Sequence, residues 1–309
     1  MILCIGPTPA TQRVLVFPQL TLDAVNRAAQ TLEGVAGKSI NVAKVLRRLG
    51  QPVVATGFAG GDRGAHLLAV LEEQGIEREF VPVAAPTRQC TTVIDQAAET
   101  ITELVEESRP VPAAAYEALK SIVRRRAAGC RAVVMSGTLT PGGPTDFYRW
   151  CIEAAKDAKA LSILDAQGAP LVEAICAQPG LVKPNRTELA ATVGKPLPDK
   201  AAVISAMREL HERGARRVVV TAGKETTLAF DGQKVWHIAA PAVAAVNPIG
   251  SGDAFTAALT WRLLQGDDLG EACRWATAAG AANALTLLAG EIDPAEVNRL
   301  AGAVVVGTL

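Results

Sequence analysis

The 309-residue sequence lacks the features that mark several large classes of protein. Its 31 Lys and Arg residues balance its 31 Asp and Glu residues, so there is no basic surplus to hold nucleic acid or an anionic membrane. No apolar run reaches the length of about 20 residues that a membrane-spanning helix needs. The N-terminus also lacks a basic segment followed by a signal-like apolar stretch. We therefore expect a cytoplasmic protein that contacts neither nucleic acid nor membrane.

Paired cysteines are missing as well. The six cysteines are scattered and form no C-x-x-C pair: Cys4, Cys90, Cys130, Cys151, Cys176 and Cys273. This pattern is typical of reduced thiols in a cytoplasmic protein, and we interpret each as a small buried apolar side chain. The composition, 49% hydrophobic and 20% charged, is ordinary for an enzyme and too apolar for a disordered chain.

Short apolar runs alternate with helical patterns along the chain. The runs predict buried strands at Ile2–Ile5, Val53–Thr56, Ala132–Ser136, Leu161–Asp165, Gly180–Lys183 and Val218–Thr221. Helical periodicity lies between them, for example at Ser39–Leu49, Ala65–Gln74 and Ala201–Arg213. A tight turn at Asp231-Gly232 predicts a hairpin of Thr227–Phe230 and Lys234–Ile238. The order predicts an α/β fold with a doubly wound, mostly parallel sheet sandwiched by helices.

Two segments break this rhythm. Residues 11–35 and 87–107 are richer in Thr, Val and polar residues and alternate like exposed strands. We expect them to form a small inserted β lid over a site. The α/β core then comprises residues 1–10, 36–86 and 108–309.

The most informative stretch is Val246–Phe255, where Gly250 and Gly252 bracket Ser251 and Asp253 follows at once. A Gly-rich turn that runs into a helix presents unpaired N–H groups and a partial positive charge, which bind anions such as phosphate. A carboxylate there is suited to accept a proton from a hydroxyl that attacks a phosphoryl group. The alternative is that Asp253 only caps the helix.

Other polar motifs also follow predicted strands or open predicted helices. Gly37-Lys38-Ser39 opens a helix but is not a P-loop, because Leu32 stands where that motif needs glycine. The segment from Lys183 to Glu188 follows a strand, and Asn185 and Glu188 have the spacing of a capping box. Ligands of open parallel sheets bind beyond the carboxyl ends of the strands. The loops that start at Ser136 and Thr221 lie at such ends.

Five ordered motifs together resemble the ribokinase-like sugar kinases, in their phosphofructokinase-B branch. Within it the chain is most similar to the group of 1-phosphofructokinase and tagatose-6-phosphate kinase. The matching motifs are Gly37-Lys38-Ser39-Ile40-Asn41-Val42-Ala43, Thr87-Arg88, Ser136 to Gly142, Lys183 to Leu189, and Asn247 to Asp253. The resemblance runs almost from end to end of the chain.

This resemblance implies an ATP-dependent kinase of a ketohexose phosphate that uses Mg²⁺. It makes Asp253 the general base and the N–H groups of Gly250, Ser251 and Gly252 the anion hole. It places substrate at Gln12, Gly37, Lys38, Asn41, Arg88 and Ser136, with Lys38, Arg88 and Ser136 on the phosphate. It places the nucleotide at Lys183, Asn185, Thr221, Gly223 and Asn283, with Asn283 near adenine. Asn185 and Glu188 organise the metal, partly through water, and the lid makes a homodimer.

One departure from the family pattern bears on the substrate. Gln12 stands where these kinases usually have a sugar-binding Asp, and an amide both donates and accepts hydrogen bonds where a carboxylate only accepts. Two alternatives therefore stay open. One is a kinase of another small sugar, polyol or nucleoside, and the other is a catalytically weak sensor of sugar phosphates.

Overall fold

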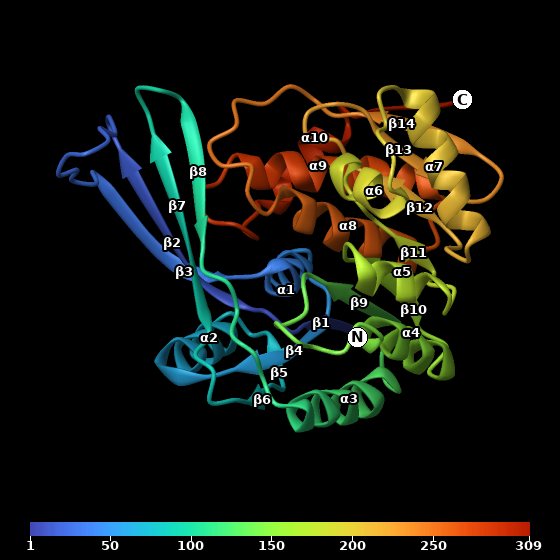
Figure 1. Ribbon diagram of the computed structural model, residues 1–309. Helices are drawn as coiled ribbons and strands as arrows, with labels where there is room; N and C mark the ends of the chain where they lie inside the picture. Colours follow the sequence, from blue (N-terminus) through green and yellow to red (C-terminus); the bar gives the residue numbers. More distant parts are fainter.

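The central layer of the protein is one large sheet whose strands are apolar on both faces. The structure is a computed structural model that describes all 309 residues (Figure 1). Along β1 (Ile2–Gly6), Ile2 and Cys4 face one hydrophobic core while Leu3 and Ile5 face the other. Because successive side chains point to opposite faces, a strand covered on both sides must be apolar throughout. The expected α/β fold is confirmed.

The order of strands in the large sheet is β15-β14-β13-β12-β11-β10-β9-β1-β4-β5, and β6 also pairs with β4. In this sheet the neighbouring strands β5, β4, β1, β9, β10, β11 and β12 are all parallel. At the other edge β13, β14 and β15 pair antiparallel. Their bounds are β4 Val53–Ala59, β5 Glu77–Arg78, β6 Val81–Pro82, β9 Ala132–Ser136, β10 Leu161–Asp165, β11 Leu181–Val182, β12 Val218–Val220, β13 Thr227–Phe230, β14 Val235–Ala239 and β15 Val305–Thr308. The hairpin predicted at Asp231-Gly232 is present as β13 and β14.

Helices cover both faces of the large sheet. One core receives side chains from α1 (Lys38–Arg48), α2 (Gly61–Glu73), α8 (Ser251–Gln265), α9 (Leu269–Ala284) and α10 (Pro294–Ala301). The other receives them from α3 (Ala113–Ala127), α4 (Phe147–Asp157), α5 (Ala169–Ile175), α6 (Arg186–Val193) and α7 (Lys200–Glu212). None of these helices combines the length and the apolarity that crossing a membrane requires.

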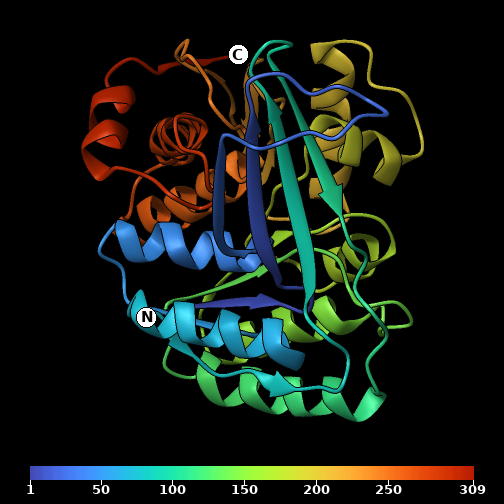
Figure 2. The same ribbon diagram turned by 90° about the vertical axis from the view of Figure 1, so that its left-hand side faces the viewer.

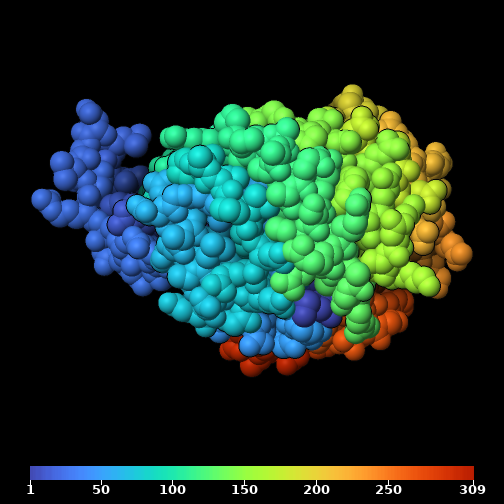
Figure 3. Space-filling model, turned by 90° about the horizontal axis from the view of Figure 1, so that it is seen from below, coloured from blue at the N-terminus to red at the C-terminus, as the bar shows by residue number.

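A second, four-stranded sheet stands upright beside the helical layers, as Figure 2 shows face on. Its strand order is β3-β2-β7-β8, from β2 (Ala10–Phe17), β3 (Gln30–Ala36), β7 (Arg88–Asp95) and β8 (Thr100–Val105). Two segments far apart in the sequence thus form one sheet, because β2 pairs in parallel with β7. The earlier of the two projects from the rounded body (Figure 3). We call this four-stranded sheet the small sheet.

Candidate active site

A cleft of about 400 Å³ lies between the small sheet and the carboxyl ends of the central parallel strands. Most of the predicted site residues line it: Gln12, Gly37, Lys38, Asn41, Arg88, Lys183, Asn185, Glu188, Thr221, Gly250, Gly252 and Asp253. Cys90 and Glu103 of the small sheet, Asp165 at the end of β10 and Ala289 also line it and were not predicted. The position agrees with the rule that open parallel sheets bind ligands beyond their carboxyl ends.

Three helices begin at this cleft. Gly37 caps α1, Asn185 caps α6 and Gly250 caps α8, and all three residues line the cavity. Gly37 and Gly250 have φ angles of 104° and 87°, which only glycine adopts without strain. Helix N-termini present unpaired N–H groups and partial positive charge. The cleft is therefore built for ligands that carry several anionic groups.

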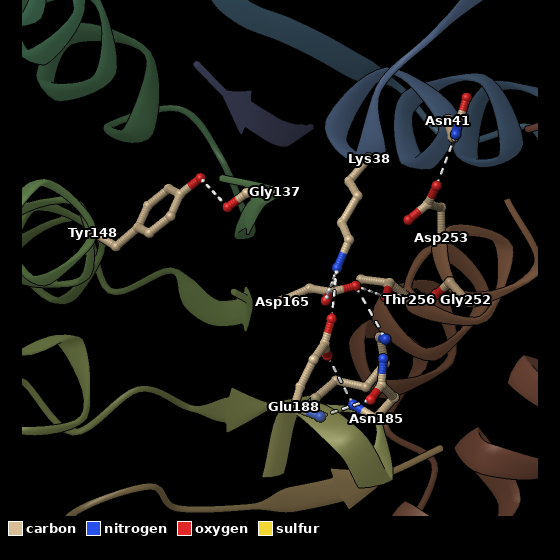
Figure 4. A network of polar contacts seen from close by, with 11 residues as sticks. Lys38, Asn41, Gly137, Tyr148, Asp165, Asn185, Glu188, Gly252, Asp253 and Thr256 are labelled. Carbon is tan, nitrogen blue, oxygen red and sulfur yellow. Dashed lines mark hydrogen bonds and ion pairs between the residues drawn. The ribbon is translucent and has the colours of Figure 1, made fainter. Parts of the chain in front are cut away.

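Asp253, in the first turn of α8, is buried with 7% of its surface exposed. Its Oδ2 accepts a hydrogen bond of 2.7 Å from Nδ2 of Asn41 on α1 (Figure 4). Burial raises the pKa of the Asp253 carboxyl to about 7, and the nearby Asp165 carboxylate adds to this, while Lys38, Asn41 and Lys183 oppose it. A carboxyl with this pKa exchanges protons readily near neutral pH, so it is suited to act as a general base.

Asp165 is the most connected side chain of the cleft. Its Oδ1 lies 3.1 Å from Nζ of Lys38, and its Oδ2 lies 3.0 Å from Nζ of Lys183. The hydroxyl of Thr256 also donates to Oδ2 at 3.2 Å. Burial alone would raise the pKa of Asp165, but the two lysines outweigh it and hold the pKa below its usual value. In Figure 4 this carboxylate lies below the Lys38 side chain and beside Thr256 of α8. One acid thus holds two cations in place.

Asn185 and Glu188 form a complete capping box at the start of α6. The Asn185 side chain accepts from N–H of Glu188, and Glu188 Oε2 accepts from N–H of Asn185. Glu188 Oε1 lies 3.4 Å from Nζ of Lys38. The capping role expected from the spacing is present, and the same two side chains also line the cleft. The cap and a ligand role are therefore compatible.

The small sheet contributes one wall of the cleft. Alternation along β7 turns Arg88 and Cys90 inward, and Glu103 approaches from β8. The guanidinium of Arg88 donates to the carbonyls of Thr8 and Glu106, and its Nε is buried without a partner. Cys90 and Glu103 were missed because strand alternation predicts a face but not what that face covers.

Two predicted site residues, Ser136 and Asn283, do not line the cleft. Ser136 is 1% exposed and does not line the cleft, because alternation along β9 puts it on the covered face of Ala132 and Val134. Asn283 is fully buried: its Nδ2 donates to the carbonyl of Ile249 and its Oδ1 accepts from N–H of Gly290. With both ends of the amide occupied, Asn283 braces the loop before α8.

The remaining predicted residues lie close to the cleft. Thr221 lines it and forms a bridge with Asn185, and Gly223 follows two residues later in the same loop with a φ of 60°. Ser251 begins α8 between Gly250 and Gly252. No three or more His, Cys, Asp or Glu side chains gather so that they could hold a metal ion.

Comparison with known proteins agrees with this geometry. Residues 1–295 match the model of the pfkB family carbohydrate kinases. The chain is 30% identical over 296 residues to a tagatose-6-phosphate kinase of Staphylococcus epidermidis, covering 95% of each protein. It is 27% identical, with a TM-score of 0.91 over 98% of each chain, to a structure of phosphofructokinase-2 from Escherichia coli in complex with substrates and products.

A structure named as a possible 1-phosphofructokinase from Thermotoga maritima shares the fold, with a TM-score of 0.92 over 100% of this chain and 99% of that one at 22% identity. The family model spans nearly the whole chain, and the glycine-rich start of α8 with its buried carboxylate lies within the matched residues. The chain therefore belongs to the pfkB family of carbohydrate kinases.

Proposed function

We propose that the protein transfers the γ-phosphoryl group of ATP to a hydroxyl of a ketohexose phosphate, as a relative of tagatose-6-phosphate kinase would. The observation that carries this proposal is the buried Asp253 carboxylate at the N-terminus of α8, with a pKa near 7. The anion-binding helix start and the base occupy one turn of helix. Phosphoryl transfer to a hydroxyl needs both groups side by side.

In this mechanism Asp253 takes the proton of the attacking hydroxyl. The N–H groups of Gly250, Ser251 and Gly252 stabilise the negative charge that develops on the transferred group, because they are fixed before the reaction starts. Asn41 holds the Asp253 carboxylate through its Nδ2. This hydrogen bond orients the carboxylate toward the cleft. The rate of phosphoryl transfer depends largely on such positioning of the base relative to the attacking hydroxyl.

Two basic residues support a substrate that already carries phosphate. Lys38 is 38% exposed into the cleft, and Arg88 lines the same cavity from the small sheet. We propose that Lys38, the first residue of α1, and Arg88 together hold the phosphate that the sugar already carries. In this proposal Asn41, which lines the cleft and holds Asp253, also contacts a sugar hydroxyl.

In this proposal the nucleotide binds at Lys183, Asn185, Thr221 and Gly223. Magnesium bound with ATP would neutralise charge on its phosphates. Mg²⁺ usually keeps several waters and takes only one or two protein carboxylates. In this proposal Asn185 and Glu188, which line the cleft, would hold such an ion partly through water.

We propose that residues 11–35 and 87–107, which contain most of the small sheet, form a lid that excludes water from the cleft. We also propose that this lid is the surface of a homodimer. Leu22 and Val25 in its long loop are 87% and 84% exposed, and Leu104 on β8 is 56% exposed. Apolar side chains exposed to this extent favour burial against a second chain. The mass of the protein in solution tests the dimer.

The test of the proposed function is ADP release by the purified protein with Mg-ATP. The panel holds fructose 1-phosphate, fructose 6-phosphate, tagatose 6-phosphate, free fructose, ribose and a nucleoside. Turnover of a phosphorylated ketohexose alone supports the proposal. Turnover of an unphosphorylated compound alone keeps the mechanism and overturns the substrate. Binding of a sugar phosphate without ADP release favours the sensor.

The pH dependence of turnover follows from the ionisation of Asp253. The base works only when deprotonated, so kcat/KM is expected to rise with pH, to be half-maximal near the pKa of about 7, and to level off above pH 8. An activity that already reaches its plateau at pH 5 would exclude Asp253 as the titrating base. Initial rates between pH 5 and 9 at constant ionic strength give the answer.

A methyl group at Gly250 is expected to damage the anion hole. Its φ of 87° is strained for alanine, and a Cβ there would lie 2.8 Å from Cβ of Ala289. Gly250→Ala should therefore lose about 1–3 kcal/mol of unfolding free energy and most of its kcat. Gly252→Ala is the matched control for stability. The atom nearest to a Cβ at Gly252 would be Nζ of Lys183, at 3.8 Å. Equal melting temperatures for the two variants would contradict this reading.

A further inference from the structure

Gln12 lies on β2 with its side chain turned into the cleft, and only 2% of the residue is exposed. Its Oε1 accepts a hydrogen bond of 3.2 Å from the backbone N–H of Ala289, which is itself fully buried. Its Nε2 makes no hydrogen bond within the protein. The amide therefore presents two free N–H donors to whatever fills this part of the cleft, while its oxygen is held by Ala289.

The orientation of this amide is fixed by its surroundings. The carbonyl of Ala289 accepts from the buried Nζ of Lys44 at 2.8 Å, and N–H of Gly290 donates to Oδ1 of Asn283. The segment that holds Gln12 is thus anchored on both sides. Rotating the amide by 180° would set its NH₂ group against N–H of Ala289 and leave a buried donor unpaired, which is unfavourable.

Gln12 also lies beside the reacting end of the cleft. Gly290, next to Ala289, packs so closely on α1 that a Cβ would lie 2.9 Å from Cα of Asn41. Asn41 in turn holds Asp253. Gln12, Asn41 and Asp253 thus line the same cleft and are linked through the segment Ala289-Gly290 and α1.

We propose that Gln12 is a specificity residue that donates to an acceptor oxygen of the substrate. The cleft then takes sugar phosphates whose oxygen at this point is a carbonyl or carboxylate oxygen as well as those with a hydroxyl. A hydroxyl satisfies Gln12 as an acceptor, and a carbonyl does so without any proton. This assignment rests on the proposed kinase activity and names the chemistry of one substrate position within it.

The test compares three forms of the best substrate from the panel at each carbon in turn: the hydroxyl compound, its oxo analogue and its deoxy analogue. At the carbon that faces Gln12, the wild type should use the hydroxyl compound better than the deoxy compound, and Gln12→Met should make their kcat/KM values equal. This result identifies the carbon. There the wild type is expected to use the oxo analogue with kcat/KM within about 3-fold of the hydroxyl compound and the deoxy analogue at least 10-fold less well.

Gln12→Glu keeps the acceptor for Ala289 and turns the donors into an acceptor oxygen, so it should reject the oxo analogue at least 10-fold at pH 8 while still using the hydroxyl compound. Gln89→Glu is the control, because it adds the same charge to β7 on the opposite face of the small sheet.

If the wild type uses the oxo and deoxy analogues with equal kcat/KM, the role proposed for Gln12 is wrong, while the proposed kinase activity stands. A Gln12→Glu variant that still uses the oxo analogue would show the same. No turnover of any phosphorylated hexose by the wild type would instead refute the proposed function, and this assignment with it.

Discussion

Asp253→Asn is expected to lower kcat by roughly 10²–10⁴-fold, which is the usual contribution of a positioned acid–base group. The amide keeps the shape of the carboxylate and can still accept from Nδ2 of Asn41, so the cleft should keep its geometry. It cannot take a proton from the attacking hydroxyl. Affinity for ATP, measured by calorimetry, should stay close to that of the wild type.

Stability gives an independent control on this variant. A carboxyl whose pKa rises from 3.8 in a model peptide to about 7 in the fold is disfavoured when ionised, so the wild type loses stability as pH rises through this range. The uncharged amide removes that cost, and Asp253→Asn should melt no lower than the wild type at pH 8. Asp62→Asn, in the exposed first turn of α2, is the matched substitution and should leave kcat unchanged. Near wild-type turnover by Asp253→Asn would remove Asp253 from the mechanism.

The layered fold could be predicted because its signals are local. The parallel strands are short, apolar on both faces and separated by helical periodicity, and the Asp231-Gly232 turn marks the hairpin β13–β14. The predicted strand Gly180–Lys183 is shorter in the structure, at Leu181–Val182. The edge strand β15 was not predicted, because its pairing with β14 joins segments about 70 residues apart.

The site was predictable where glycine-rich turns open helices and unpredictable where contacts are long-range. Asp165 was missed although it ends β10, because a single acidic residue after a strand does not stand out until Lys38 and Lys183 meet it. Ser136 was expected in the site but does not line the cleft. Its loop does lie at the end of a strand, but whether its side chain faces the cleft depends on the register of β9 under α1.

Asp165→Asn is expected to destabilise the protein by on the order of 3–5 kcal/mol, the usual cost of removing one partner of a buried ion pair. Lys183 is 4% exposed, and Asp165 is the one carboxylate it contacts. The variant would leave the Lys183 ammonium buried without its ion-pair partner. Lys38 would be less affected, since it keeps Glu188 and is partly exposed. Chemical denaturation monitored by circular dichroism measures the loss.

Two further variants show whether this loss comes from the ion pair. Glu209→Gln removes the acid shared by Lys195 and Arg213 at the surface and should cost less than about 1 kcal/mol. Adding Lys183→Met to Asp165→Asn removes the unpaired cation and should restore much of the stability. If the double variant is no more stable than Asp165→Asn, the destabilisation comes from lost packing and hydrogen bonds around β10. Restored stability would mean that the main structural role of Asp165 is to pair with the buried Lys183.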